Sequence, residues 1–304
     1  DNANDCCIEN CIIQNCTNDL IRVGNGLRCN ISNNKLCNTN GYGAVKLLPN
    51  VAQTNTDHIV ANNVFSGVLG SHPILISYAD GDVVTGNIIR GTLISGLKVN
   101  LVAGSTTVTA TAGTFANVAP GYYIISDASS APGGFAPYEM FVTKVNSATS
   151  LTIGSPSAFT VTNANTVAGP GDMISVGAAS RIIIANNQIS GGAGGGIIVS
   201  DEFNITNVYE SLQMIQINNN QIWNFAGAGI SIQTGDYNNA SQALNNMIVG
   251  NMITNCGVGN ASGTYGSGIA IQAGGNVLKS TFIDGNFVYD NQSSPTTHYW
   301  CVLN

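Results

Sequence analysis

The stretch Ile182-Ile183-Ile184-Ala185-Asn186-Asn187-Gln188-Ile189 decides the fold of this chain of 304 residues. Its second asparagine follows an aliphatic residue by three positions and precedes another by two. The same frame, with cysteine or an aromatic ring replacing some aliphatic side chains, surrounds eight asparagines: Asn10, Asn34, Asn63, Asn87, Asn187, Asn220, Asn251 and Asn286. Most are roughly 24 to 35 residues apart, a period typical of solenoids, whose repeats bury their apolar faces by stacking on one another.

A second aliphatic strand follows most of these asparagines, as in Ile197-Ile198-Val199 and Ile230-Ser231-Ile232. Because side chains in a strand alternate between two faces, we expect the first and third residues of each triplet to point inward. Coils stacked at about 4.8 Å place the asparagines above one another, where their amides form a hydrogen-bonded column. The repeated asparagine is therefore interpreted as structural.

The I-x-x-N-x-I corner and the G-I-x-I strand resemble the pectate-lyase-like family of right-handed parallel β-helices, in particular NosD-like repeats and phage tailspike bodies. The resemblance covers residues 1–95 and 172–304. It implies an all-β fold, a right-handed single-stranded parallel β-helix. Lyases, hydrolases, epimerases and inert binding shafts share this architecture, so the resemblance does not by itself select an activity.

The repeat is interrupted between Asn87 and Asn187, which are 100 residues apart. An insertion over residues 96–171 explains the gap. Its short alternating segments, joined by Gly, Pro, Ser and Asn turns, predict a small antiparallel β-barrel or sandwich. The segment 106–124 resembles small β modules that decorate phage tail proteins. The resemblance to pectate-lyase-like proteins places this insert beside a saccharide groove on the face of the second strands.

Composition excludes several classes of partner. The net charge is −7 and only nine Lys and Arg residues are present, which argues against a nucleic-acid surface and against anionic lipid. No apolar run is long enough to cross a bilayer, so no membrane insertion is expected. No nucleotide, zinc or serine-hydrolase motif occurs, and Asp80-Gly81-Asp82 lacks the further oxygen ligands of a calcium loop. We therefore predict no cofactor and no metal.

Cysteines are concentrated near the start of the chain, and two more lie near its end: Cys6, Cys7, Cys11, Cys16, Cys29, Cys37, Cys256 and Cys301. Cys7 is expected at the inward position that Ile31 takes in the next coil, where a thiol behaves as a small apolar side chain. A stack of thiols is the favoured interpretation. Disulfides stay open as the alternative.

The outward positions of the second strands carry none of the aspartates that pectate lyases and polygalacturonases place there, so neither activity is predicted. Acids occur instead in the turns that follow, and the candidate catalytic residues are Asp201, Glu202 and Asp236. Neighbouring rungs let two such carboxylates reach the roughly 5 to 9 Å separations of glycosidases. The alternative is that these acids cap turns, which is ordinary chemistry for aspartate.

Aromatic and amide side chains near the same turns suit a saccharide, because flat rings stack on sugar faces and amides bind hydroxyls. The candidate substrate-binding residues are Asp80, Tyr78, Phe203, Tyr209, Gln233, Tyr237 and Gln272. Trp223 is interpreted as packing between coils or subunits. Equally, each of these rings could pack a long loop onto the shaft.

Three functional classes follow. The first is a phage tailspike or tail-fibre-like virion protein, a homotrimer in the virion tail or the extracellular space, that binds a cell-surface polysaccharide. Whether it also cleaves the polysaccharide, as a glycosidase or lyase, stays open. The second is a secreted bacterial lyase, hydrolase or epimerase, and the third is a non-enzymatic structural or adhesive shaft. Since the first residue is not Met and repeats begin near it, we expect part of a longer protein or ends buried against other subunits.

Overall fold

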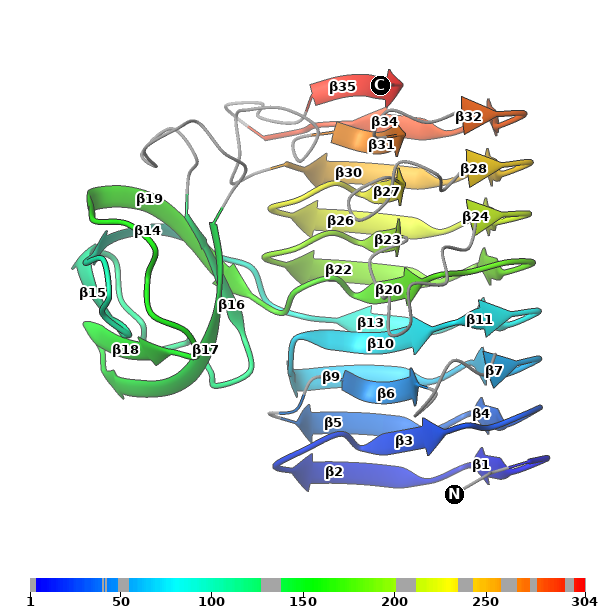
Figure 1. The fold of residues 1–304 in the computed structure, drawn as a ribbon, viewed down its shortest axis with the longest axis horizontal. Coiled ribbons are helices and arrows are strands. Elements are labelled where there is room, and N and C mark those ends of the chain that lie inside the picture. Colours follow the sequence, from blue (N-terminus) through cyan, green and yellow to red (C-terminus); the bar gives the residue numbers. More distant parts are fainter. Residues whose placement is uncertain are drawn as a thin grey trace.

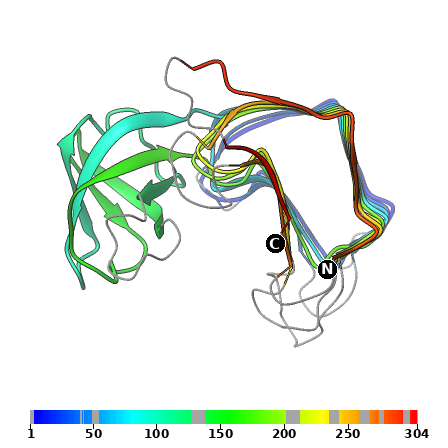
Figure 2. The same cartoon turned by 90° about the horizontal axis from the view of Figure 1, so that it is seen from above.

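The computed structural model describes residues 4–39, 41, 43–48, 55–126, 138–200, 212–234, 243–257, 267–273, 278–292 and 298–303. These residues form three eight-stranded parallel sheets and one closed antiparallel barrel, and no helix occurs among them (Figure 1). The predicted all-β fold, a parallel β-helix with an inserted small β module, is confirmed. Seen from above, the coils lie over one another and the barrel projects from one corner (Figure 2).

Each coil contributes one strand to each large sheet. Sheet B contains β1 (Cys7–Glu9), β4 (Asn30–Ser32), β8 (Ile59–Ala61), β12 (Val83–Thr85), β21 (Ile183–Ala185), β25 (Gln216–Asn218), β29 (Met247–Val249) and β33 (Phe282–Asp284). Sheet C contains β2 (Ile12–Cys16), β5 (Lys35–Thr39), β9 (Val64–Leu69), β13 (Ile88–Arg90), β22 (Gln188–Gly192), β26 (Gln221–Phe225), β30 (Met252–Cys256) and β34 (Phe287–Tyr289).

Sheet D contains β3 (Ile21–Gly24), β6 (Gly43–Leu48), β10 (His72–Ser77), β20 (Ile174–Gly177), β23 (Ile197–Ser200), β27 (Ile230–Thr234), β31 (Ser267–Ala273) and β35 (His298–Leu303). Short strands link sheet D back to sheet B. They are β7 (Asn55–Thr56), β11 (Ala79–Asp80), β24 (Leu212–Gln213), β28 (Ala243–Leu244) and β32 (Leu278–Lys279). We call the eight-coil stack of these sheets the shaft.

The asparagine column lies at the corner between sheets B and C. Asn187 Oδ1 accepts the main-chain N–H and the Nδ2 of Asn87 at 2.9 and 3.0 Å. Asn187 Nδ2 in turn donates to Val84 O at 3.0 Å and to Asn220 Oδ1 at 2.9 Å. The same pattern joins Asn34, Asn63, Asn87, Asn187, Asn220, Asn251 and Asn286. The structural interpretation of these amides is confirmed.

The first coil departs from the predicted register by one residue. Ile8, not Cys7, pairs with Ile31, and Cys7 pairs with Asn30 and is exposed. The predicted inward position of Cys7 is therefore wrong. Cys11 takes the ladder position that was assigned to Asn10, and its main-chain N–H donates to Asn34 Oδ1 at 3.0 Å. The cause is that the cysteines and isoleucines of this coil fit the same frame in either register.

Asn10 instead belongs to the column immediately before the ladder, whose residues have a left-handed backbone. The φ angles there include 57° at Asn10, 57° at Asn33 and 67° at Gly86. This region is costly for most L-residues, and asparagine and glycine tolerate it best. The Asn-Asn pairs of the repeat therefore combine a left-handed corner residue with a ladder amide.

Aliphatic side chains fill the interior of the shaft. The first and third residues of the second strands, such as Ile197 and Val199, are buried in one continuous cluster, as predicted from the alternation. The seven cysteines whose state the structure describes are free thiols: Cys6, Cys7, Cys11, Cys16, Cys29, Cys37 and Cys256. Cys29 and Cys37 are buried, whereas Cys6 and Cys11 are exposed.

The barrel interrupts the fourth coil between β13 and β20. Its strands are β14 (Ile94–Leu101), β15 (Thr107–Ala112), β16 (Tyr123–Ser126), β17 (Tyr138–Ser147), β18 (Ser150–Ile153) and β19 (Val161–Gly169). The barrel has its own apolar core, which includes Phe115 and Leu151. A small separate cluster, in which Ile125 and Val167 pack with Ala193 and Ala226, fixes the barrel to the shaft.

Candidate functional site

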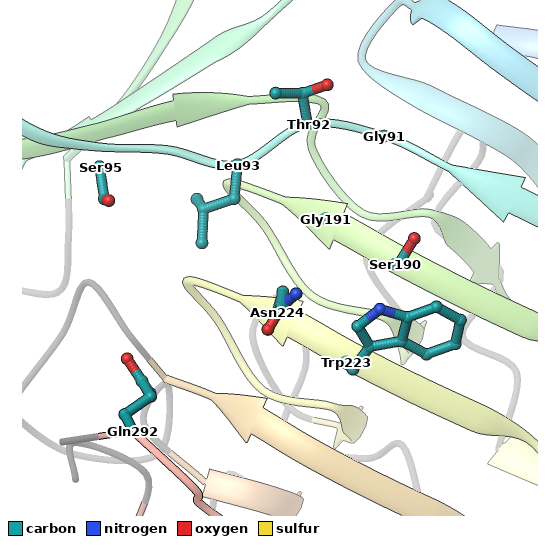
Figure 3. A pocket seen from close by; sticks show the side chains of 9 residues that line it. All are labelled: Gly91, Thr92, Leu93, Ser95, Ser190, Gly191, Trp223, Asn224 and Gln292. Atoms are coloured by element: carbon teal, nitrogen blue, oxygen red, sulfur yellow. The ribbon is translucent and has the colours of Figure 1, made fainter.

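Two hollows lie on the outer face of sheet C, beside the root of the barrel and on the coils that follow it, and Figure 3 shows the first of them. The first, about 360 Å³, is lined by Gly91, Thr92, Leu93, Ser95, Ser190, Gly191, Trp223, Asn224 and Gln292. The second, about 340 Å³, is lined by Gln221, Ile222, Trp223, Asn224, Met252, Thr254, Asn255, Tyr289 and Asn291. Because Trp223 and Asn224 line both, the hollows form one surface, which we call the sheet C groove.

The aromatic side chains of the groove are placed by strand alternation. In β26, Ile222 is buried and its neighbour Trp223 therefore points outward. The register pairs Trp223 with Ser190 on one side and with Thr254 on the other, and Thr254 pairs with Tyr289. Trp223 and Tyr289 thus lie in one column, two rungs or roughly 9.6 Å apart. Figure 3 shows the indole of Trp223 beside Ser190 of the neighbouring strand.

A second asparagine ladder, exposed to solvent, runs along the end of the same strands. Asn255 Nδ2 donates to Asn291 Oδ1 at 2.8 Å and lies 3.4 Å from Asn224 Oδ1. The main-chain N–H of Asn291 donates to Asn255 Oδ1 at 3.0 Å. A side-chain amide has two donor hydrogens and two acceptor lone pairs, so these exposed amides retain capacity for hydroxyl groups of a ligand.

The groove carries no formal charge on any of its lining residues. Asp290 is the nearest acid in sequence, and its carboxylate accepts hydrogen bonds from Gln292 N at 2.9 Å and from Gln292 Nε2 at 3.3 Å. That carboxylate orients a lining amide. The lining described here supplies rings, amides and hydroxyls, which bind polar uncharged groups, and it supplies no acid or base.

Two of the predicted site residues have structural contacts in the shaft. Asp80 accepts hydrogen bonds from Ser180 Oγ at 2.7 Å and from Arg181 Nε at 2.7 Å, and its ion pair with Arg181 holds the pKa of the carboxyl below its usual value. Tyr78 is 3% exposed and has a left-handed φ of 56°. A ring so deeply buried presents little surface for stacking on a sugar.

Gln233 and Gln272 pair in register on adjacent rungs of sheet D. Gln233 Nε2 donates to Ser231 Oγ at 2.9 Å. The outward residues of this sheet are largely buried, with exposed fractions of 3% for Leu75, 4% for Ser175 and 1% for Ser231. Over these positions, the sheet D face is therefore less accessible than the alternation alone indicates.

The predicted catalytic residues Asp201, Glu202 and Asp236 lie outside the described residues, as do Phe203, Tyr209 and Tyr237. Their roles stay predictions. Strand β23, which ends just before residue 201, pairs with β20 on one side and with β27 on the other. The strands of sheet D therefore stack in chain order here, as predicted.

Sequence reasoning missed a titratable pair under the barrel. His72 Nδ1 lies 3.4 Å from Asp172 O, and Asp172 Oδ1 accepts the N–H of Gly195 at 2.7 Å. Burial lowers the pKa of the His72 imidazole and raises the pKa of the Asp172 carboxyl. The ring of Tyr123, from the barrel, lies 6.0 Å from that of His72. This pair contributes to the joint between barrel and shaft.

Sequence reasoning also missed the groove itself, although one signal for it was available. Trp223 directly follows the inward Ile222 of the repeat, which puts the indole on the outer face. Within the described ranges, no three His, Cys, Asp or Glu side chains come together as metal ligands. In the same ranges no helix has the length and hydropathy to span a bilayer.

Comparisons with known proteins extend only to the fold. No protein-family model matches the chain, and no curated protein matches it. The solved tailspike gp61 of Pseudomonas phage phi297 is 15% identical, with 85% of this chain and 42% of that one covered and a TM-score of 0.27. The Gp54 tailspike of Acinetobacter baumannii bacteriophage AP22 is 9% identical, with coverages of 88% and 41% and a TM-score of 0.22.

The structure of one enzyme is also similar to this chain, and the similarity is equally low. DFA-IIIase from Arthrobacter chlorophenolicus is 11% identical, with 93% of this chain and 56% of that one covered and a TM-score of 0.30. The chain spans about half the length of these proteins, between 41% and 56%. At such TM-scores the likeness carries no conclusion about activity.

Proposed function

We propose that this chain is the β-helix body of a tailspike-like or tail-fibre-like virion protein, and that it binds a host surface polysaccharide in the sheet C groove. The observation that supports the proposal is the chemistry of that groove. Two aromatic side chains, Trp223 and Tyr289, stand in one outward column beside a ladder of exposed amides.

Saccharides fit this surface better than other ligands. A sugar ring offers an apolar face for an aromatic ring and hydroxyls at its edge for exposed amides such as that of Asn224. Nucleic acid would require Lys or Arg against its phosphates, and the groove lining contains neither. The shallow, open form of the groove suits a polymer that extends beyond both ends of the site.

The architecture of the chain supports a recognition role as well. The shaft is rigid because each coil hydrogen-bonds to its neighbours over three sheets. The barrel is inserted next to the groove, and Thr92, Leu93 and Ser95 at its root line the first hollow. Inserted loops and modules on such a scaffold vary without unfolding it, which makes them common sites of specificity.

Binding is tested with a panel of capsular and lipopolysaccharide glycans. Trp223→Ala should weaken the affinity by a factor on the order of 30, the effect typical of a central aromatic anchor. Phe282→Ala is the matched control, because Phe282 is an exposed aromatic residue of sheet B that lines neither hollow. Equal affinities for wild type and Trp223→Ala, or no binding by either, contradict the proposal.

Cleavage of the bound polysaccharide is a separate part of the proposal, with Asp201, Glu202 and Asp236 as the acids that would perform it. Product release by wild type should be lost in Asp201→Asn and Asp236→Asn while glycan affinity is retained. Binding without products from any glycan identifies a non-enzymatic adhesive shaft. Cleavage that survives both substitutions excludes these residues as the catalytic acids.

Assembly as a homotrimer, in a virion tail or the extracellular space, completes the proposal. Light scattering should give three times the mass of one chain, which is 31.4 kDa. A monomer with lyase, hydrolase or epimerase activity would instead favour the secreted β-helix enzyme, the second candidate class.

A further inference from the structure

We infer that the ligand of the sheet C groove is an uncharged glycan chain that runs parallel to the shaft axis, across the rungs, with Trp223 and Tyr289 as successive stacking positions. The inference rests on the proposed function. It adds the direction of the ligand, its charge class and the order of its contacts.

The direction follows from how the aromatic residues are spaced. Trp223 and Tyr289 occupy the same outward position on strands two rungs apart, with Thr254 between them. Two rungs span roughly 9.6 Å, which is comparable to the length of a disaccharide unit. A chain laid along the axis therefore meets one ring and then a second ring, with the largely buried Thr254 between them. A chain laid along β26 instead would meet Trp223 and no second aromatic column.

The amides follow the same direction. Asn224, Asn255 and Asn291 stand on three successive rungs beside the aromatic column, and their mutual hydrogen bonds keep them in line. The first hollow continues this line past Ser190 and Gly191 toward the root of the barrel. Each of these rungs thus presents a side-chain amide that can bind a hydroxyl group, which suits a ligand that is itself a repeating chain.

The charge class follows from the groove lining and from the whole chain. No lining residue has a formal charge, and the nearby Asp290 carboxylate is held by Gln292. The exposed Arg90, which pairs with Ser190, is one cation at the barrel end of the same column. The chain as a whole carries a net charge of −7. A glycan with a carboxylate in every repeat would lose its hydration and meet only Arg90 as a cationic partner along this column, and the net charge of the chain would repel it at low salt. Neutral sugars incur neither cost.

The test uses oligosaccharides graded by length, both neutral and uronate-bearing, prepared from the capsular and lipopolysaccharide panel. Binding of a disaccharide, a tetrasaccharide and a hexasaccharide is measured for wild type, Trp223→Ala and Tyr289→Ala by calorimetry. Trp223→Ala should weaken every length. Tyr289→Ala should leave the disaccharide unchanged and weaken the hexasaccharide by roughly 10-fold or more.

Two controls separate stacking from folding. Phe287→Ala removes a ring from the same strand that lies 5.1 Å from Tyr289 but lines neither hollow, so it should leave all affinities unchanged. Tyr289→Phe should retain hexasaccharide binding, since the ring is kept. Affinity of wild type should also be the same in low and high salt.

The experiment distinguishes failure of this inference from failure of the proposed function. If Trp223→Ala weakens binding but Tyr289→Ala does not weaken binding of an oligosaccharide of any length, the axial direction is wrong and the proposed function stands. Preference for the uronate-bearing set, or an affinity that falls with salt, overturns the uncharged class alone. A panel in which no oligosaccharide binds, or in which Trp223→Ala has no effect, contradicts both proposals.

Discussion

The shaft and the inserted barrel are both built from strands, yet they satisfy buried polar groups in different ways. The shaft buries one ladder amide in nearly every coil and connects each to the next by hydrogen bonds. The barrel closes its own sheet, and in its described part the buried polar groups are small hydroxyls such as Ser157 and Thr166. Stability of the shaft is thus a series of nearest-neighbour links, whereas stability of the barrel is shared around a closed ring.

The largest difference is expected when one such link is removed. Asn187→Ala deletes an amide that makes four hydrogen bonds, and it leaves the N–H of Asn87 and the carbonyl of Val84 buried without that partner. Since each unpaired buried group costs about 1 to 3 kcal/mol, the free energy of unfolding should fall by about 3 to 5 kcal/mol. Denaturant unfolding, followed by circular dichroism, measures it.

Thr166→Ala is the matched change in the barrel. Thr166 is buried and its Oγ1 donates a single hydrogen bond to Ala164 O at 3.1 Å. Its removal should cost about 1 kcal/mol. Comparable losses for the two substitutions would mean that the ladder does not distinguish the shaft from the barrel.

The second difference concerns glycines with the same backbone conformation. Gly86 in the shaft and Gly96 in the barrel have φ angles of 67° and 73°. A Cβ on Gly86 would overlap Asn62 Oδ1 of the coil below, whereas a Cβ on Gly96 meets nothing within 4 Å. Gly96→Ala should therefore cost only the left-handed conformation, about 1 kcal/mol, whereas Gly86→Ala must also turn the Asn62 side chain away and should cost about 2 kcal/mol.

Melting temperatures of the two glycine variants provide the measurement. The physical reason for the larger loss is stacking, because a side chain at Gly86 must displace the Asn62 side chain of the coil below. If Gly96→Ala proves as damaging as Gly86→Ala, backbone strain alone accounts for both and the packing between coils adds nothing.

The fold could be predicted from sequence because its main determinants are local and repeated. The ladder residue, the left-handed residue before it and the alternating strand after it lie within about a dozen positions, so seven ladder asparagines were identified correctly. The first coil shows where this fails. Cys7, Ile8 and Cys11 are all small or apolar enough to fit the core, so the pattern there permits two registers.

The candidate site could be predicted far less well, because it depends on which outer face is open. Alternation places Trp223 and Ser231 on outward positions alike, but Ser231 is buried and Trp223 lines a groove. Exposure of a sheet is decided by what the intervening loops and the barrel cover, which is a long-range property. The ion pair between Asp80 and Arg181 was hidden for the same reason, because the two residues are 101 positions apart in sequence and the insert lies between them.

The smallest expected effect concerns a carboxyl buried inside the shaft, whereas the described residues of the barrel include no buried carboxyl. Asp82 Oδ1 accepts the N–H of His58 at 2.6 Å, and burial raises the pKa of the Asp82 carboxyl to about 8. Burial lowers the pKa of the His58 imidazole from its ordinary 6.5. The equivalent residue three coils later is Asn246, whose Oδ1 accepts the N–H of Ile215 at 3.0 Å.

The sign of the pH dependence follows from proton binding. The unfolded Asp82 carboxyl loses its proton near pH 3.9, whereas the folded one keeps it to about pH 8, so this group lowers stability as pH rises across that interval. His58 acts in the opposite direction, but only below about pH 6.5. Asparagine does not titrate, so the stability of Asp82→Asn relative to wild type should rise by about 1 to 2 kcal/mol between pH 6.5 and pH 8.

Asp80→Asn is the control, since Asp80 belongs to the same turn but its ion pair with Arg181 lies at the surface. Arg181 lowers the pKa of the Asp80 carboxyl, so the stabilisation it provides is present above about pH 3.9 and does not change between pH 6.5 and 8. Its removal should cost less than about 1 kcal/mol at either pH. Parallel pH profiles of unfolding for wild type and Asp82→Asn would show that this buried carboxyl is ionised throughout, and that the interior of the shaft tolerates charge.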